Sequence, residues 1–141
     1  YQERLVSAQD LVVRWLETRS EKELFVYPQV VTLARGVIAE AFSNKVITPG
    51  VTTTDDIAWY IRERFEELQL RPWFQPYVNI QRRGDETTKD DVFMGKYGLT
   101  VQPGDVIHTD VGICYLNLCT DTQEMAYVLK MDETDVPQGR L

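Results

Sequence analysis

Several features that define common protein classes are scarce in this sequence. It has only two cysteines in 141 residues, Cys114 and Cys119, so no second pair is available for a disulfide scaffold or a four-thiolate zinc site. We expect both to be small apolar side chains in a reducing compartment, which predicts a cytoplasmic location. No apolar run approaches the roughly 20 residues that a membrane span requires, so no membrane partner is expected.

Basic residues are outnumbered, because 15 lysines and arginines stand against 22 aspartates and glutamates, for a formal net charge of −7. Proteins that bind nucleic acids usually carry a basic stripe or patch, and the nearest feature here is the pair Arg82-Arg83. We therefore expect no nucleic-acid partner. With 43% hydrophobic residues, the chain can bury roughly two-thirds of its unfolded surface, which is enough for one core.

The first half of the chain has helical periodicity. Residues 7–10 resemble a capping box that opens a short helix, and residues 20–23 open a longer one with apolar residues at intervals of three and four. Pro28 lies inside that second pattern and predicts a kink or a helix that starts later. Thr53 caps a third helix with one apolar stripe, formed by Ile57, Ile61, Phe65 and Leu68. Helices are thus expected within about residues 7–70.

Strand-like alternation occupies about residues 73–129. A Pro-Gly-Asp turn at 103–105 precedes a strand at 106–113, and a second strand is expected at 120–129. Helices that come before an antiparallel hairpin indicate an α+β fold, with the helices packed on one face of an antiparallel sheet.

Two aspartates in this hairpin, Asp110 and Asp121, carry the main chemical prediction. If the hairpin closes with a four-residue loop at 114–117, the two lie directly opposite each other, with Cβ atoms about 4.5–5.5 Å apart. Carboxylates at that distance repel each other and lose hydration, and a divalent cation bound by both would remove the conflict. Gly112 leaves space on the same face.

The same spacing allows a second interpretation. Two aspartates on a hairpin commonly lie on its solvated face, and a shift of one residue in register would send one of them to the opposite face. A plain α+β domain with two exposed aspartates therefore stays open. His108 also has two interpretations. It shares a face with Asp110 and could orient that carboxylate, or it is a half-buried histidine bonded to backbone.

The run Val-Gln-Pro-Gly-Asp-Val-Ile-His-Thr-Asp-Val-Gly at 101–112, followed by Tyr115 and Asp121, resembles the first metal-binding hairpin of the pita-bread metallopeptidases. That family comprises methionine aminopeptidase, aminopeptidase P, prolidase and creatinase, and the nearest likeness is to the Xaa-Pro dipeptidase and aminopeptidase P branch. The shared pattern is a Pro-Gly-Asp turn, a strand bearing Asp-x-Gly, and a second Asp eleven residues after the first. Residues 47–56, a Pro-Gly turn before a Thr-capped helix, resemble a helix junction of the same fold.

The resemblance implies that Asp110 and Asp121 are two of five ligands in a centre of two divalent metal ions. The ions would share a water or hydroxide of lowered pKa, which attacks the scissile carbonyl of a short peptide substrate. Manganese, cobalt, zinc and iron suit such ligands, and the resemblance favours manganese. The family's remaining ligands, a His and two Glu, lie well downstream. Residues 1–141 are therefore expected to be a single partial domain, the N-terminal half of a pita-bread catalytic domain, inactive by itself.

Other positions depart from the family pattern. Gln75 takes the place of a family histidine that binds substrate or moves protons, and glutamine cannot exchange a proton near neutral pH. After the second aspartate the family carries x-Thr-Arg, whereas this chain has Thr-Gln-Glu at 122–124. The resulting candidates for contacts to substrate or to the metal ligands are His108, Gln75, Gln123 and Tyr115.

Two functions follow from the resemblance. The leading one is a metal-dependent peptidase of the Xaa-Pro dipeptidase and aminopeptidase type. The alternative is a pita-bread homologue without catalysis that binds peptides or proteins. The two aspartates favour the enzyme, because a pure binding module has no need of opposed carboxylates, whereas Gln75 is consistent with an altered substrate choice or reduced activity. An uncovered half-sheet also predicts a homodimer.

Overall fold

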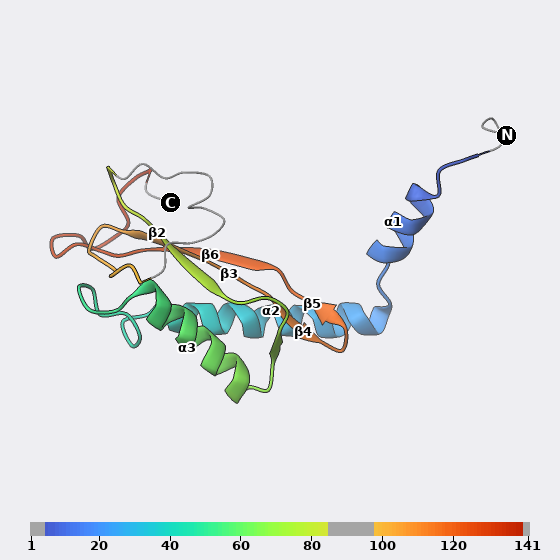
Figure 1. Cartoon of the computed structure of the whole chain (residues 1–141), viewed down its shortest axis with the longest axis horizontal. Helices are drawn as coiled ribbons and strands as arrows, with labels where there is room; N and C mark the ends of the chain where they lie inside the picture. Colours follow the sequence, from blue (N-terminus) through green and yellow to red (C-terminus); the bar gives the residue numbers. More distant parts are fainter. Residues whose placement is uncertain (1–4, 85–97, 140–141) are drawn as a thin grey trace.

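The computed structural model describes residues 5–84 and 98–139, and in it the helices precede the strands (Figure 1). The helices are α1 (Gln9–Glu17), α2 (Glu21–Ala41) and α3 (Thr54–Glu67). The strands are β1 (Arg71–Pro72), β2 (Tyr77–Gln81), β3 (Val106–Val111), β4 (Ile113–Tyr115), β5 (Leu118–Cys119) and β6 (Thr122–Tyr127). The α+β class expected from the sequence is confirmed.

Two of the three helices begin at the capping residues that the sequence indicates. Ser20 caps α2 and Thr53 caps α3, and each forms a reciprocal capping box with the acidic residue three positions later. The box expected at residues 7–10 is wrong, because α1 is capped by Ala8 without a side-chain hydrogen bond. No residue of α1 is buried, and α1 stands away from the body formed by α2, α3 and the strands (Figure 1).

Helix α2 runs from Glu21 through Pro28 to Ala41, so the alternative of a later start is wrong. By length and composition α2 could cross a membrane, a test that core helices of soluble proteins also pass. In this structure 28% of its apolar window is buried. Its buried residues and those of α3 join one apolar cluster with the strands: Val30, Ala34, Val37, Ile38, Ala41, Ile57, Ile61 and Phe65.

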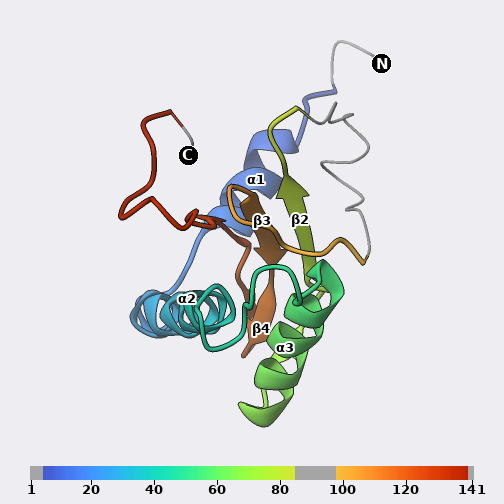
Figure 2. The ribbon, with the colours of Figure 1, turned by 90° about the vertical axis from the view of Figure 1, so that its left-hand side faces the viewer.

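The strands form two antiparallel three-stranded sheets, in the orders β2-β3-β6 and β1-β4-β5. Helices α2 and α3 pack against the same side of the strands (Figure 2). Alternate strand residues on that side are buried in the core, among them Val78, Ile107 and Val111. The opposite side of the β2-β3-β6 sheet, which we call the far face, carries Tyr77, Asn79, His108, Asp110 and Gln123.

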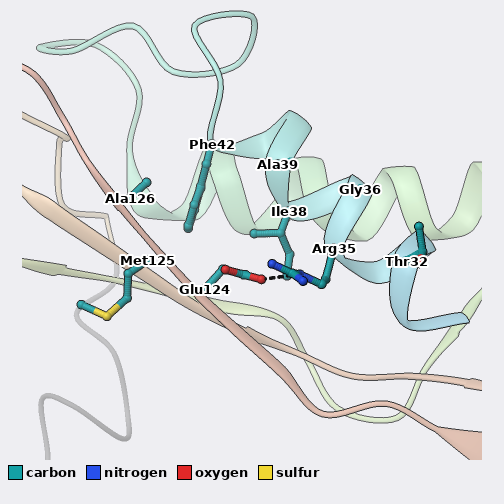
Figure 3. A pocket seen from close by; sticks show the side chains of 9 residues that line it. All are labelled: Thr32, Arg35, Gly36, Ile38, Ala39, Phe42, Glu124, Met125 and Ala126. Atoms are coloured by element: carbon teal, nitrogen blue, oxygen red, sulfur yellow. Dashed lines mark hydrogen bonds and ion pairs between the residues drawn. The ribbon is translucent and has the colours of Figure 1, made fainter. Parts of the chain in front are cut away.

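A groove of about 580 Å³ lies between α2 and β6 on the helix side of the sheet. The Nε atom of Arg35 lies 2.6 Å from Oε1 of Glu124, and this ion pair joins the helix to the strand (Figure 3). Glu124 lies opposite Thr109, which is buried on the helix side. The groove is therefore separated by the sheet from the far face that holds Asp110.

Candidate metal centre

The hairpin that brings the two aspartates together closes more tightly than the sequence indicates. Its turn is Leu116-Asn117, and both residues have positive φ, 49° and 63°. Such angles at two successive residues are typical of a two-residue hairpin turn whose twist matches the strands. Cys114 pairs with Cys119 and Tyr115 with Leu118, so the predicted four-residue loop at 114–117 is wrong.

This correction moves the register by two residues and leaves the faces unchanged. Asp110 lies opposite Gln123 of β6 and opposite Tyr77 of β2, not opposite Asp121. Because side chains alternate with a period of two, a shift of two residues keeps Asp121 on the far face, diagonal to Asp110. The slip of one residue that would have separated the two aspartates does not occur.

Asp110 is held in an electrostatically unfavourable position. Its Oδ2 atom accepts a hydrogen bond from Nε2 of Gln123 at 3.0 Å, whereas Oδ1 is buried and has no partner among the described residues. Burial raises the pKa of the Asp110 carboxyl, and the neighbouring Asp121 carboxylate raises it further. His108 and the bond from Gln123 lower this pKa. A cation would stabilise this arrangement, in which an acceptor atom lacks a donor and lies beside a second carboxylate.

These two carboxylates fit part of a divalent-metal site. Both supply the hard oxygen ligands that Mn²⁺ and related ions bind, and one oxygen of Asp110 has no competing hydrogen bond. Within residues 5–84 and 98–139, no group of three or more His, Cys, Asp and Glu side chains could hold a metal ion. The described chain therefore offers two carboxylates that could bind a cation, without a third side chain of these types grouped with them.

The structure places the four other candidate residues differently. Gln123 donates to Asp110, and its Oε1 lies 3.2 Å from Nε2 of His108, so the hydrogen-bonded connection between His108 and Asp110 runs through Gln123. Gln75 is exposed between β1 and β2, and Tyr115 is exposed beside the hairpin turn. No hydrogen bond among the described residues joins either of these two to the carboxylates.

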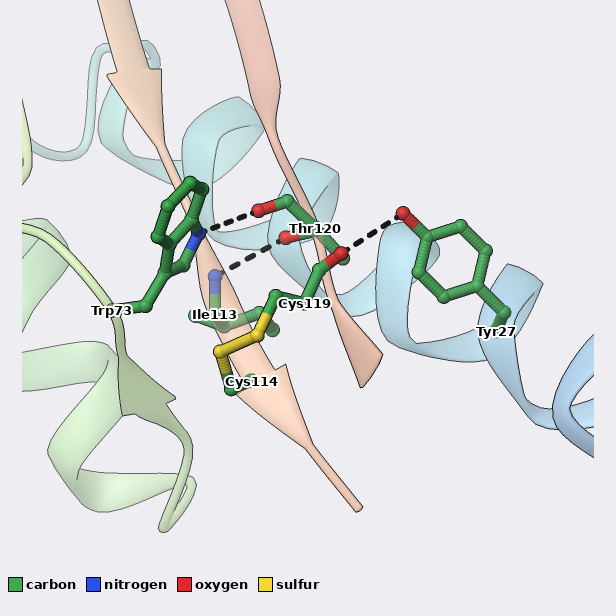
Figure 4. Close-up of a disulfide and its surroundings, with 6 residues drawn as sticks. All are labelled: Tyr27, Trp73, Ile113, Cys114, Cys119 and Thr120. Carbon is green, nitrogen blue, oxygen red and sulfur yellow. Dashed lines mark hydrogen bonds between the residues drawn. A yellow bond between two sulfur atoms is a disulfide. The ribbon is translucent and has the colours of Figure 1, made fainter. Parts of the chain in front are cut away.

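The space at Gly112 is filled by the protein itself. A Cβ atom at this position would lie 1.7 Å from Nε1 of Trp73 and 2.5 Å from Cε1 of Phe74. The Nε1 atom of Trp73 donates to the carbonyl of Thr120 at 2.7 Å, directly before Asp121 (Figure 4). Position 112 therefore requires a glycine, because the indole ring of Trp73 occupies the space that a side chain would fill at the edge of the carboxylate pair.

Tyr77 is a member of the site that the sequence did not indicate. It pairs with Asp110 from β2, and its ring centroid lies 6.0 Å from that of His108. Burial raises the pKa of the Tyr77 hydroxyl, and the charges of Asp110 and Asp121 raise it further. The phenol therefore stays protonated beside the two carboxylates and can donate a hydrogen bond there.

The two cysteines are not separate apolar side chains but form a disulfide, which corrects the sequence interpretation (Figure 4). The bond ties β4 to β5 two residues before Asp121. The carbonyl of Cys119 also accepts a hydrogen bond from the hydroxyl of Tyr27 on α2. Disulfides persist mainly in oxidising compartments. The cytoplasmic location rested on free thiols, so it stays a prediction that has lost this support.

Comparison with known proteins gives the family. The sequence profile of metallopeptidase family M24 matches residues 28–138, from α2 to beyond the carboxylate hairpin. The chain belongs to metallopeptidase family M24. Members of family M24 use divalent metals, and Asp110 and Asp121 lie within the matched region. No curated protein sequence matches this M24 chain significantly.

Solved structures show the same fold. The X-Pro aminopeptidase of Thermotoga maritima MSB8 superposes with a TM-score of 0.65 at 22% identity, covering 84% of this chain and 32% of that one. A variant of Escherichia coli aminopeptidase P, solved in complex with substrate, gives 0.65 at 13% identity, covering 88% and 27%. These likenesses confirm the pita-bread fold of this M24 chain, which spans about a third or less of either relative.

Proposed function

We propose that the protein containing this chain is a metal-dependent peptidase of the Xaa-Pro aminopeptidase and dipeptidase type. The observation that carries this proposal is the diagonal pair Asp110 and Asp121 on the far face, with a buried Oδ1 of Asp110 that lacks a partner. A buried acceptor of this kind costs free energy unless a donor or a cation meets it. The pair is therefore better explained by a cation than by a role in folding.

In this proposal Asp110 and Asp121 hold divalent metal ions, two in a complete site, with manganese favoured over cobalt, zinc and iron. Bound metal of this kind lowers the pKa of water and polarises a peptide carbonyl. Other residues of this chain position the two carboxylates. Gln123 holds Oδ2 of Asp110 at 3.0 Å, and Tyr77 places a protonated hydroxyl group beside the two carboxylates.

The proposed substrates are short peptides with proline after the N-terminal residue. Support comes from the names of the two structural relatives, an X-Pro aminopeptidase and an aminopeptidase P. The described residues supply no further group of metal-ligating side chains, so we expect no hydrolysis by them alone. A homodimer is proposed as well, since the far face of the sheet is free of the described helices.

The alternative, a pita-bread homologue that only binds peptides or proteins, predicts no response to metal. The test uses the full-length protein stripped of metal and then titrated with Mn²⁺. We expect a rise in melting temperature and hydrolysis of an Xaa-Pro peptide, and Asp110→Ala or Asp121→Ala should each abolish both. The binding module would be favoured if the wild type bound peptides but neither hydrolysed them nor gained melting temperature with metal. A rise that survives in either variant would refute the ligand assignment.

A further inference from the structure

The far face contains a directed chain of three side chains that ends on Asp110. Nε2 of His108 lies 3.2 Å from Oε1 of Gln123, and Nε2 of Gln123 donates to Oδ2 of Asp110 at 3.0 Å. His108 and Asp110 project from β3 on the same face, and Gln123 reaches both from β6. The amide group thus bridges two residues of the neighbouring strand.

The donor and acceptor roles in this chain are fixed by chemistry. An ionised carboxylate only accepts, so the NH₂ group of Gln123 must face Asp110 and the carbonyl oxygen must face His108. That oxygen also only accepts, so Nε2 of His108 must carry a proton and donate it. The carboxylate thus fixes the orientation of the Gln123 amide, and the amide oxygen fixes the protonated nitrogen of His108. A glutamine held at both ends loses the freedom to turn its amide around.

The two oxygens of Asp110 consequently have different surroundings. Oδ2 is occupied by the Gln123 amide, whereas Oδ1 is buried and has no partner among the described residues. A carboxylate held by one oxygen cannot rotate freely, so the other oxygen is presented in a fixed direction. Partners of this kind, behind a ligand, orient it and raise its affinity for metal, and losing one typically lowers the affinity about 10–100-fold.

We infer that Gln123 is a positioning residue for a divalent cation at Asp110 and that His108 orients this ligand through its hydrogen bond to Gln123. The inference rests on the proposed function, because it assumes that Asp110 binds the metal. It assigns His108 no contact with metal or substrate. It also gives a role to Gln123, which lies where the chain departs from the Thr-Arg pattern expected for its family.

The experiment measures Mn²⁺ affinity by calorimetry on the metal-free full-length protein, so it does not depend on peptidase activity. Gln123→Met keeps the length of the side chain and removes both hydrogen bonds. We expect its dissociation constant to rise about tenfold or more. The melting temperature of the metal-free form should stay close to that of the wild type, since Gln123 is exposed. Gln81→Met, the same change at an exposed glutamine of β2 remote from Asp110, is the matched control and should keep the wild-type affinity.

A double-mutant cycle separates action through Gln123 from direct action of His108. His108→Phe should weaken Mn²⁺ binding several-fold in the wild type and should have a much smaller effect once Gln123→Met is present, because only the electrostatic influence of His108 on Asp110 then remains. Equal effects of His108→Phe in both backgrounds would overturn the relay. Gln123→Asn, whose shorter amide cannot span the two partners, covers the case in which Gln123→Met does not fold, and it should lose affinity similarly.

The outcomes distinguish the relay from the proposed function. A wild type that binds Mn²⁺ while Gln123→Met and Gln123→Asn bind it equally well overturns the relay and leaves the metal site standing. A wild type that shows no Mn²⁺ binding overturns the proposed function, and the relay with it. Loss of affinity with an unchanged melting temperature supports the relay.

Discussion

The indole ring of Trp73 occupies the space above Gly112, and a Cβ atom on this glycine would lie 1.7 Å from Nε1. The backbone N–H of Trp73 donates to the carbonyl of Gly112, and Nε1 donates to the carbonyl of Thr120. One tryptophan therefore bridges both strands of the hairpin where β3 passes into β4. This bridge fixes the backbone on either side of the carboxylate pair.

Gly112→Ala should consequently be disruptive. The methyl group cannot be accommodated without moving the Trp73 ring, and overpacking of this kind typically costs about 1–3 kcal/mol. Urea denaturation measures the loss, and tryptophan fluorescence reports the displaced indole. Gly36→Ala is the matched control, because a Cβ atom there meets nothing within 4 Å and Gly36 lies inside α2. This control should gain about 0.5–1 kcal/mol. A Gly112→Ala protein as stable as the wild type would refute the clash.

The turn of the Pro-Gly-Asp motif is fixed by a buried charge. Both carboxylate oxygens of Asp105 lie 2.8 Å from guanidinium nitrogens of Arg82, and Asp105 is only 1% exposed. Arg82→Met leaves that carboxylate with the backbone N–H of Gln102, and we expect a loss of about 1–3 kcal/mol in unfolding free energy, because the Arg82 side chain is 40% exposed. Arg83→Met, at the exposed neighbour, should change it by less than about 0.5 kcal/mol. Equal losses in the two variants would show that the ion pair does not anchor the turn.

Local signals in the sequence were sufficient to predict the fold class and to place both aspartates on one face of the hairpin. Helix caps at Ser20 and Thr53 and the Pro-Gly-Asp turn depend on residues a few positions apart, so they can be recognised without tertiary information. The register was two residues wrong because the turn Leu116-Asn117 lacks the usual Asn-Gly signal. A leucine with positive φ is uncommon, and propensity alone argues against it.

Contacts between distant segments could not be predicted in this way. Tyr77 meets Asp110 only because β2 pairs with β3, a pairing between residues more than thirty positions apart in the chain. Trp73 reaches Gly112 for a similar reason, through the pairing of β1 with β4. The disulfide was missed because the assumed register did not place Cys114 opposite Cys119, whereas the two-residue turn does.

Removal of the disulfide should lower stability without unfolding the hairpin. In the loop-entropy model, a loop this short contributes about 2 kcal/mol, so Cys114→Ser with Cys119→Ser should cost about that amount. Hydrogen bonds from Tyr27 and Trp73 to the β5–β6 junction remain in place. Thermal melts with and without reductant measure the effect. The reductant should lower the melting temperature of the wild type and leave the double variant unchanged, and an equal response of both would contradict the bond.

Asp110 should make the metal-free protein less stable at neutral pH than at acidic pH. Burial and Asp121 raise the folded-state pKa of its carboxyl above the unfolded value, so the folded state binds this proton more tightly. The resulting stabilisation is complete below the unfolded pKa, near pH 4, and is lost as the pH rises through the folded pKa. Asp110→Asn removes the charge at similar shape. In the presence of a chelator it should therefore be more stable than the wild type at pH 7, and this advantage should disappear below about pH 4.

Added Mn²⁺ should reverse this order at pH 7, because the wild type gains stability from binding and Asp110→Asn loses a ligand. Chemical denaturation at both pH values, with chelator and with Mn²⁺, gives the four comparisons. Asp132→Asn, the same change on the exposed segment after β6, is the matched control and should stay close to the wild type throughout. If Asp110→Asn were less stable than the wild type at pH 7 with chelator, the carboxylate would serve folding. The missing hydrogen-bond partner of Oδ1 could then no longer be explained by a cation site.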